Sequence, residues 1–155
     1  MEERIFHRIL VPTDFSPQSE RAWATARRLA RALGAELVLL HVFVELPFYS
    51  EVPLSAERVR EAHGAARTWA VEHLDQWAAT ARASGLDVKT LLRTGIAHED
   101  IVATARDEGA DLIAIDTHGR GGLNRLMLGS VCDRVIRLAP CPVLAIREGE
   151  TQRAC

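Results

Sequence analysis

Short apolar runs that alternate with helical patterns constrain this sequence more than any other feature. Residues 36–44 and 111–115 are almost continuously apolar, and residues 5–11 become apolar toward their end. Such runs are typical of parallel strands covered on both faces, because every side chain then needs an apolar neighbour. Residues 86–94 alternate polar and apolar, which predicts an outer strand, and residues 143–146 form a last short apolar run.

Helices are predicted between these strands. Ser16 followed by Pro17 predicts a helix start, since serine caps a free N–H and proline suits the first helical position. Gly34 is placed to end that helix, and further helices are predicted over residues 55–84, 97–108 and 129–138. In the long second helix, steps of three and four predict a broad stripe made of Val59, Ala62, Ala66, Trp69, His73 and Trp77.

The alternation of strands and helices predicts the fold class. Strands that are separated by helices pair in parallel through right-handed crossovers, which gives a doubly wound α/β sheet of five strands. We expect one domain over residues 1–155, with a core of about 4–147 and a loose tail at 148–155. Ligands of such sheets bind at the carboxyl ends of the strands, here residues 12–16, 42–44 and 116–130.

Composition excludes several classes of partner. Nineteen Lys and Arg against 21 Asp and Glu give a formal net charge of -2, without the basic excess of a nucleic-acid binder. No apolar run reaches the roughly 20 residues of a membrane-spanning helix. The first residues show no signal-peptide pattern, and the three cysteines have no CxxC spacing. Together these features predict a cytoplasmic protein with reduced thiols, no membrane partner and no nucleic-acid partner.

The segment from Asp116 to Gly122 is the most glycine-dense in the chain, and Gly129 and Ser130 follow it at a predicted helix start. Glycines let several backbone N–H groups approach an anion, and a helix amino terminus adds a positive dipole end. The segment therefore predicts a phosphate site. The alternative is a glycine-rich surface loop followed by an ordinary serine cap.

Asp14 lies directly after the first predicted strand. A carboxylate at the carboxyl end of a strand can accept hydrogen bonds from ribose hydroxyls. The alternative is that Asp14 only stabilises its own turn by bonding to backbone N–H groups.

Nearly the whole chain carries a set of motifs in a fixed order: RILVPTDFS at 8–16, LLHV at 39–42, GADLI at 109–113, THGRGG at 117–122, LGSV at 128–131 and CPVL at 141–144. In these motifs the chain resembles the universal stress protein family in its single-domain form. The resemblance implies a Rossmann-like sheet of the adenine nucleotide alpha hydrolase-like kind, with strand order 3-2-1-4-5.

The ATP-binding branch of that family carries G-x-x-G, then nine residues, then G-[ST]. Here Gly119, Gly129 and Ser130 match this spacing, but Asp116 stands at the first glycine. A carboxylate there repels a triphosphate unless it turns away to cap its own loop or shares a cation with the phosphates. One prediction is that Asp116 holds Mg²⁺ or Mn²⁺ through the bound phosphates; the alternative is that it points away and caps its own loop.

The resemblance also implies the other contacts. Pro12 and Thr13 would line the adenine, Asp14 would meet the ribose, and the backbone of Val42 would bond to adenine. Weaker candidates in the glycine segment are His118 and Arg120, which could touch phosphate. The full predicted ATP site is Pro12, Thr13, Asp14, Val42, Asp116, His118, Gly119, Arg120, Gly129, Ser130 and Val131.

The resulting hypothesis is a stress-linked regulatory protein that binds an adenine nucleotide, with ATP as the favoured ligand and no catalytic residues. We also expect a homodimer that pairs the edge strands at residues 143–146. Two alternatives stay open: an interaction protein that uses the same fold without nucleotide, and a weak ATP hydrolase. Efficient turnover is not expected, because residues 12–16 lack the Ser-Gly-Gly phosphate loop of hydrolases on this fold. A phosphoacceptor receiver domain is excluded, because no lysine follows the last strands.

Overall fold

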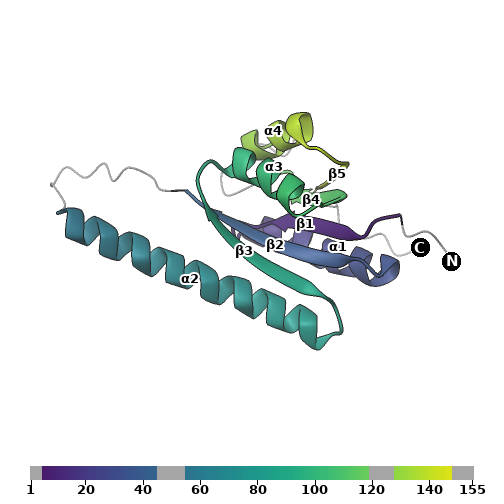
Figure 1. Cartoon of the computed structure of the whole chain (residues 1–155), viewed down its shortest axis with the longest axis horizontal. Helices are drawn as coiled ribbons and strands as arrows, with labels where there is room; N and C mark the ends of the chain where they lie inside the picture. The colour runs from purple at the N-terminus through teal and green to yellow at the C-terminus, as the bar shows by residue number, and fades with distance from the viewer. Residues whose placement is uncertain (1–4, 45–54, 119–127, 148–155) are drawn as a thin grey trace.

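A computed structural model describes residues 5–44, 55–118 and 128–147. All of the predicted strands and helices occur within this part of the chain (Figure 1). They are β1 Arg8–Pro12, α1 Pro17–Leu33, β2 Glu36–Phe43, α2 Ala56–Ala83, β3 Val88–Thr94, α3 Ala97–Asp107, β4 Leu112–Asp116, α4 Ser130–Leu138 and β5 Val143–Ile146.

The strands form one parallel sheet in the order β3-β2-β1-β4-β5, which confirms the predicted class and strand order. Successive side chains of β1 alternate between its faces: Ile9 and Val11 pack with α1 and α2, whereas Leu10 packs with α3 and α4. Helices therefore cover both faces, as the apolar strands required. Strand order reverses between β1 and β4, so their carboxyl ends border the crevice where doubly wound sheets bind ligands.

The predicted signals at the ends of α1 are confirmed. The Ser16 side chain accepts a hydrogen bond from the N–H of Ser19 at 3.1 Å, and Pro17 occupies the first helical position. Gly34 ends the helix at φ 65°, in the left-handed region that glycine adopts without steric cost. These local signals fix where α1 begins, which matters because it begins beside the carboxyl end of β1.

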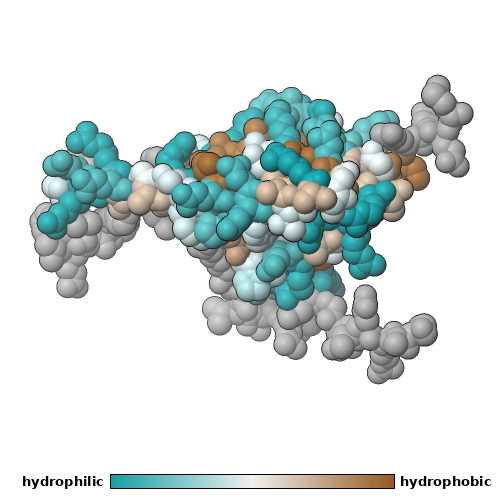
Figure 2. All heavy atoms as spheres, turned by 90° about the horizontal axis from the view of Figure 1, so that it is seen from below, coloured by the Kyte–Doolittle hydropathy of each residue, from teal (hydrophilic) through white to brown (hydrophobic). Residues whose placement is uncertain are grey.

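The predicted stripe of α2 borders the fully buried face of the helix: Val59, Ala66, His73 and Trp77 are half-buried, and Trp77 packs against the core. The residues that α2 buries are Ala70, Leu74, Ala78 and Ala81, whereas Trp69 is 43% exposed and Ala62 is exposed. The first turns of α2 extend beyond the sheet (Figure 1), so no strand covers them. Over the sheet, three alanines and Leu74 are buried, and Trp77 is partly buried against the same core. Figure 2 shows the projecting end of α2 at the left, covered by hydrophilic side chains.

Charged groups join the amino ends of the strands. Asp111, just before β4, accepts hydrogen bonds from the N–H groups of His7 (2.8 Å) and Arg8 (3.0 Å). The Arg8 guanidinium in turn donates to Glu36 on β2 at 2.7 Å. Partial burial disfavours ionisation of Asp111, but the Arg8 and His7 N–H groups outweigh it and lower the pKa of this carboxyl. Asp111 therefore stabilises the fold mainly in its ionised form.

We expect Asp111→Asn to lower the free energy of unfolding by about 1 kcal/mol at pH 7, since one backbone N–H loses its charged acceptor and the site is partly solvated. A lowered folded-state pKa contributes stability above the unfolded-state pKa and loses it as the pH falls through the folded-state value. The difference between variant and wild type should therefore shrink in acid. Urea unfolding at pH 7 and pH 3 measures this. Asp75→Asn, on an exposed position of α2, is the control and should match wild type.

Candidate functional site

The carboxyl ends of β1, β2 and β4 meet the amino end of α4 at one edge of the sheet. The N–H of Thr13 donates to the carbonyl of Leu40 at 2.8 Å, which ties the loop after β1 to β2. The N–H of Gly129 donates to the carbonyl of Thr117 at 2.7 Å, which ties the start of α4 to the end of β4. The sheet thus brings together nine of the predicted site residues: Pro12, Thr13, Asp14, Val42, Asp116, His118, Gly129, Ser130 and Val131. Gly119 and Arg120 lie outside the described residues.

The loop after β1 is held by its own side chains. Asp14 Oδ1 accepts a hydrogen bond from the N–H of Ser16 at 3.0 Å, and Thr13 Oγ1 accepts one from the N–H of Phe15 at 2.9 Å. The Thr13 hydroxyl also pairs with the hydroxyl of Ser19 at 2.9 Å. Asp14 therefore stabilises its own turn through a backbone N–H group, which was the alternative to a ribose contact in the sequence analysis. A carboxylate accepts several hydrogen bonds, so this contact is compatible with a further one to a ligand hydroxyl.

Asp116 is the last residue of β4 and is 8% exposed. Its Oδ2 accepts a hydrogen bond from the N–H of His118 at 3.3 Å, which is the loop-capping contact. Burial raises the pKa of Asp116 and outweighs the N–H groups of His118 and Thr117 and the guanidinium of Arg21, which favour the charged form. The structure thus adds Arg21, on α1, to the charges around this carboxylate. Sequence analysis missed it, although its place in the second turn of a helix that begins beside β1 is a usable signal.

The loop that follows Asp116 begins in a fixed conformation. Thr117 is 1% exposed, and its hydroxyl lies 2.7 Å from Nδ1 of His118. Nε2 of His118 is buried and has no hydrogen-bond partner among the described residues. A buried ring nitrogen of this kind is a polar group that a ligand or a water can satisfy.

The amino end of α4 offers backbone N–H groups. Gly129 is its N-cap, in an extended conformation (φ -60°, ψ 150°), and it has no side chain with which to cap the helix. The first N–H groups of a helix have no partner within the helix, and the dipole makes this end positive. Ser130 and Val131 form the first turn, so the arrangement suits an anion at the crevice between β1 and β4.

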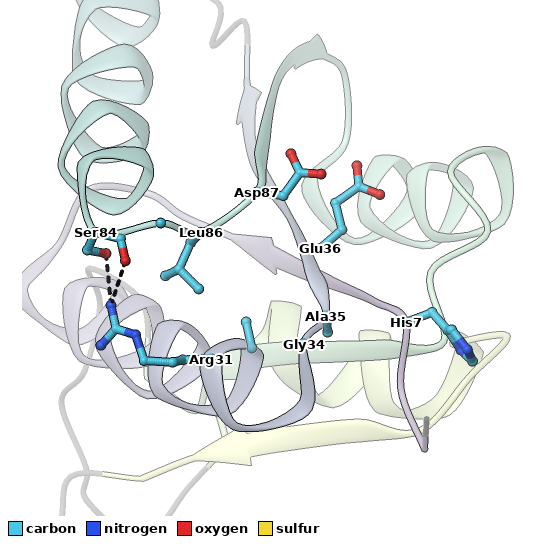
Figure 3. Close-up of a pocket in the computed structure, with 10 residues that line it drawn as sticks. His7, Arg31, Gly34, Ala35, Glu36, Ser84, Leu86 and Asp87 are labelled. Carbon is cyan, nitrogen blue, oxygen red and sulfur yellow. Dashed lines mark hydrogen bonds between the residues drawn. The ribbon is translucent and has the colours of Figure 1, made fainter. Parts of the chain in front are cut away.

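A hollow of about 480 Å³ lies at the opposite end of the sheet, by His7, Glu36 and the loop between α2 and β3 (Figure 3). Arg31 donates there to the Ser84 hydroxyl at 2.9 Å. The carboxyl-terminal ends of α1 and α2 border the hollow, and the carboxylates of Glu36 and Asp87 lie side by side in it. Helix carboxyl ends are negative, so this hollow does not suit a phosphate.

Neither a cluster of metal ligands nor a membrane-spanning helix occurs among the residues that the structure describes. Within residues 5–44, 55–118 and 128–147, no group of three or more His, Cys, Asp or Glu side chains is placed to hold a metal ion. Over the same residues, no helix has the length and apolar character needed to span a bilayer.

The fold and this edge define a doubly wound α/β domain in which the amino end of a helix lies at the switch point of the sheet. The chain belongs to the universal stress protein family, whose model matches residues 5–147. It is 32% identical to the universal stress protein MJ0531 of Methanocaldococcus jannaschii, over 94% of this chain and 85% of that protein.

Solved structures of the same family are similar. The universal stress protein UspA from Lactobacillus plantarum superposes with a TM-score of 0.80 at 27% identity, covering 91% of this chain and 97% of that one. A universal stress protein in complex with cAMP gives 0.67 at 25% identity, over 92% of this chain and 97% of the other. One from Archaeoglobus fulgidus in complex with dAMP gives 0.61 at 27% identity, over 92% and 99%.

Proposed function

We propose that this chain is a stress-linked regulatory protein that binds an adenine nucleotide, with ATP as its ligand, at the carboxyl edge of the sheet. The amino end of α4, which begins at a glycine N-cap and is joined to β4 by the hydrogen bond from Gly129 to Thr117, is the observation that carries the proposal. Relatives of the same fold in complex with cAMP and dAMP support an adenine nucleotide. The spacing of Gly119, Gly129 and Ser130 supports a ligand with several phosphates.

The same contacts support binding without efficient turnover. Asp14 and Asp116 each accept a hydrogen bond from the backbone of their own loop, which holds the two carboxylates in place for binding. Burial, followed by the charges of Asp116 and Asp133, raises the pKa of the Cys132 thiol to about 11, so this thiol stays protonated and is a poor nucleophile. Cys132 and Cys141 are free thiols, which supports a cytoplasmic location.

Gly129→Val should abolish ATP binding, because a branched side chain fills the space that a phosphate needs against the helix end. The backbone of Gly129 lies in a region that valine also adopts, so the fold should persist. Calorimetric titration with ATP and AMP, together with circular dichroism, measures both points. We expect the variant to lose ATP and wild type to bind ATP more tightly than AMP.

Gly64→Val is the matched control, since a Cβ at Gly64 meets nothing within 4 Å. It should bind ATP as wild type does. Unchanged ATP affinity in Gly129→Val would move the nucleotide away from α4. Failure of wild type to bind any nucleotide would favour the nucleotide-independent interaction protein.

The position of Asp116 predicts that ATP binding depends on a divalent cation. A carboxylate about 4 Å from a phosphate opposes binding by roughly 4 kcal/mol per charge pair at an effective dielectric near 20, and a bridging Mg²⁺ or Mn²⁺ reverses this. We expect wild type to bind ATP with Mg²⁺ and weakly with EDTA, and Asp116→Gly to bind in both conditions. Equal affinities in all four titrations would mean that Asp116 only caps its own loop, the role its bond from His118 supports.

The outer edge of β5 supports the proposed homodimer. Within the described residues, β5 pairs with β4 alone. Backbone N–H groups of β4 and of the residue after it donate to the carbonyls of Pro142 (3.0 Å) and Ile146 (3.1 Å). Alternation along the strand then directs the N–H groups of Val143 and Ala145 outward. Nearby apolar side chains are also exposed: Ile136 by 42%, Leu138 by 52% and Leu144 by 37%.

Ala145→Pro should give a monomer, because proline removes an outward N–H that a second copy of β5 would need, while the bonds to β4 remain. Light scattering at micromolar concentration measures the mass of both proteins. The control is Ala145→Val, which keeps the backbone N–H and should stay dimeric. A monomeric wild type would contradict the proposal.

A further inference from the structure

The loop that carries Asp14 has an unusual backbone. Phe15 has φ 59°, and it is the one non-glycine residue with positive φ in the described part of the chain. Side chains other than those of Asn and Asp rarely occupy this left-handed region. The residue after Asp14 therefore keeps its conformation because other contacts hold it.

His41, on β2, contacts both neighbours of Asp14. Its Nδ1 lies 2.7 Å from the carbonyl oxygen of Thr13, and since a carbonyl only accepts, the ring nitrogen donates. The imidazole ring also lies against Phe15, with ring centroids 4.8 Å apart. One side chain thus fixes the carbonyl before Asp14 and the ring after it.

Helix α2 holds Phe15 from the other side. The ring centroids of Trp69, His73 and Trp77 lie 5.2, 5.6 and 5.5 Å from that of Phe15, in edge-on geometries. Trp69 and His73 also pack on each other at 3.8 Å. These three rings and His41 form a cage that we call the Phe15 clasp. The clasp restricts the position of the Phe15 ring and thereby helps to hold the backbone of Phe15 in its left-handed conformation.

We propose that His41 is a positioning residue for ribose recognition: its hydrogen bond to Thr13 and its contact with Phe15 hold Asp14 where it meets the ribose hydroxyls. This inference rests on the proposed nucleotide-binding function. His41 on β2, together with the aromatic side chains of α2 in the Phe15 clasp, then influences which sugar the site accepts. His41 acts through the backbone of the loop and need not touch the ligand.

The test compares the affinities of ATP and 2′,3′-dideoxy-ATP by calorimetry. Wild type should prefer ATP by about tenfold or more, as expected for hydrogen bonds between a carboxylate and hydroxyls. Asp14→Ala should lose this preference and so calibrates the ribose contact. His41→Phe keeps a ring against Phe15 but removes the donor, and should also lose the preference, with dideoxy-ATP affinity changed by no more than about twofold.

Rescue separates positioning from a general loss of structure. His41→Asn places an amide N–H near the position of Nδ1 and should restore most of the preference. His63→Phe, on α2 beside Phe43 rather than Phe15, is the matched control and should keep it. If His41→Phe does not fold, Phe15→Gly accepts the same backbone conformation without the ring, and should lose the preference as well.

An unchanged preference in folded His41→Phe or in Phe15→Gly overturns the role of the clasp. Equal loss of both nucleotides in His41→Phe, without rescue by His41→Asn, also overturns it, because that pattern indicates general damage to the site. No preference in wild type overturns the ribose contact itself, and no binding of either nucleotide by wild type overturns the proposed function together with the inference.

Discussion

The parallel pairing of β1 with β4 is the constraint on which the rest of the structure depends. Ile9 lies opposite Leu112 and Leu10 opposite Ile113, so two strands far apart in the sequence run side by side at the centre of the sheet. The chain crosses to the other side of β1 at this point. The loops after β1 and β4 consequently diverge around a crevice, and α4 begins beside it. Burial of both strand faces makes this pairing costly to break.

The two ends of the sheet differ in how their polar groups are hydrogen-bonded. At the amino ends, Asp111, Arg8 and Glu36 satisfy one another, and the network stabilises the edge. At the carboxyl ends, polar groups point at their own loops, and a helix end and the His118 ring nitrogen have no partner among the described residues. Buried polar groups are usually paired in folded proteins, so the unpaired nitrogen of His118 differs from the paired groups at the amino ends. The hollow near Glu36 and the crevice near Gly129 differ in charge because helix carboxyl ends border the hollow, whereas a helix amino end borders the crevice.

Local signals predicted a large part of this architecture. Ser16, Pro17 and Gly34 fixed α1 because caps act over a few residues. The apolar runs predicted the strands because burial on both faces requires apolar side chains throughout. The predicted stripe of α2 is only half-buried at residues such as His73 and Trp77, and the fully buried positions of the helix are others, among them Ala70 and Leu74. Which face of a helix meets the sheet depends on where the helix lies and how far it projects, and a periodic pattern contains neither.

The sequence by itself determined the strand and helix order, the parallel sheet, and the residues at strand ends that could meet a nucleotide. Only the tertiary structure decided that Arg21 lies near Asp116, that Asp116 caps its own loop, and that His41 and α2 grip the loop of Asp14. The physical reason is range. Caps and apolar periodicity arise from neighbours along the chain, whereas charge pairs and ring contacts depend on distances that the packing of α1 and α2 against the sheet sets.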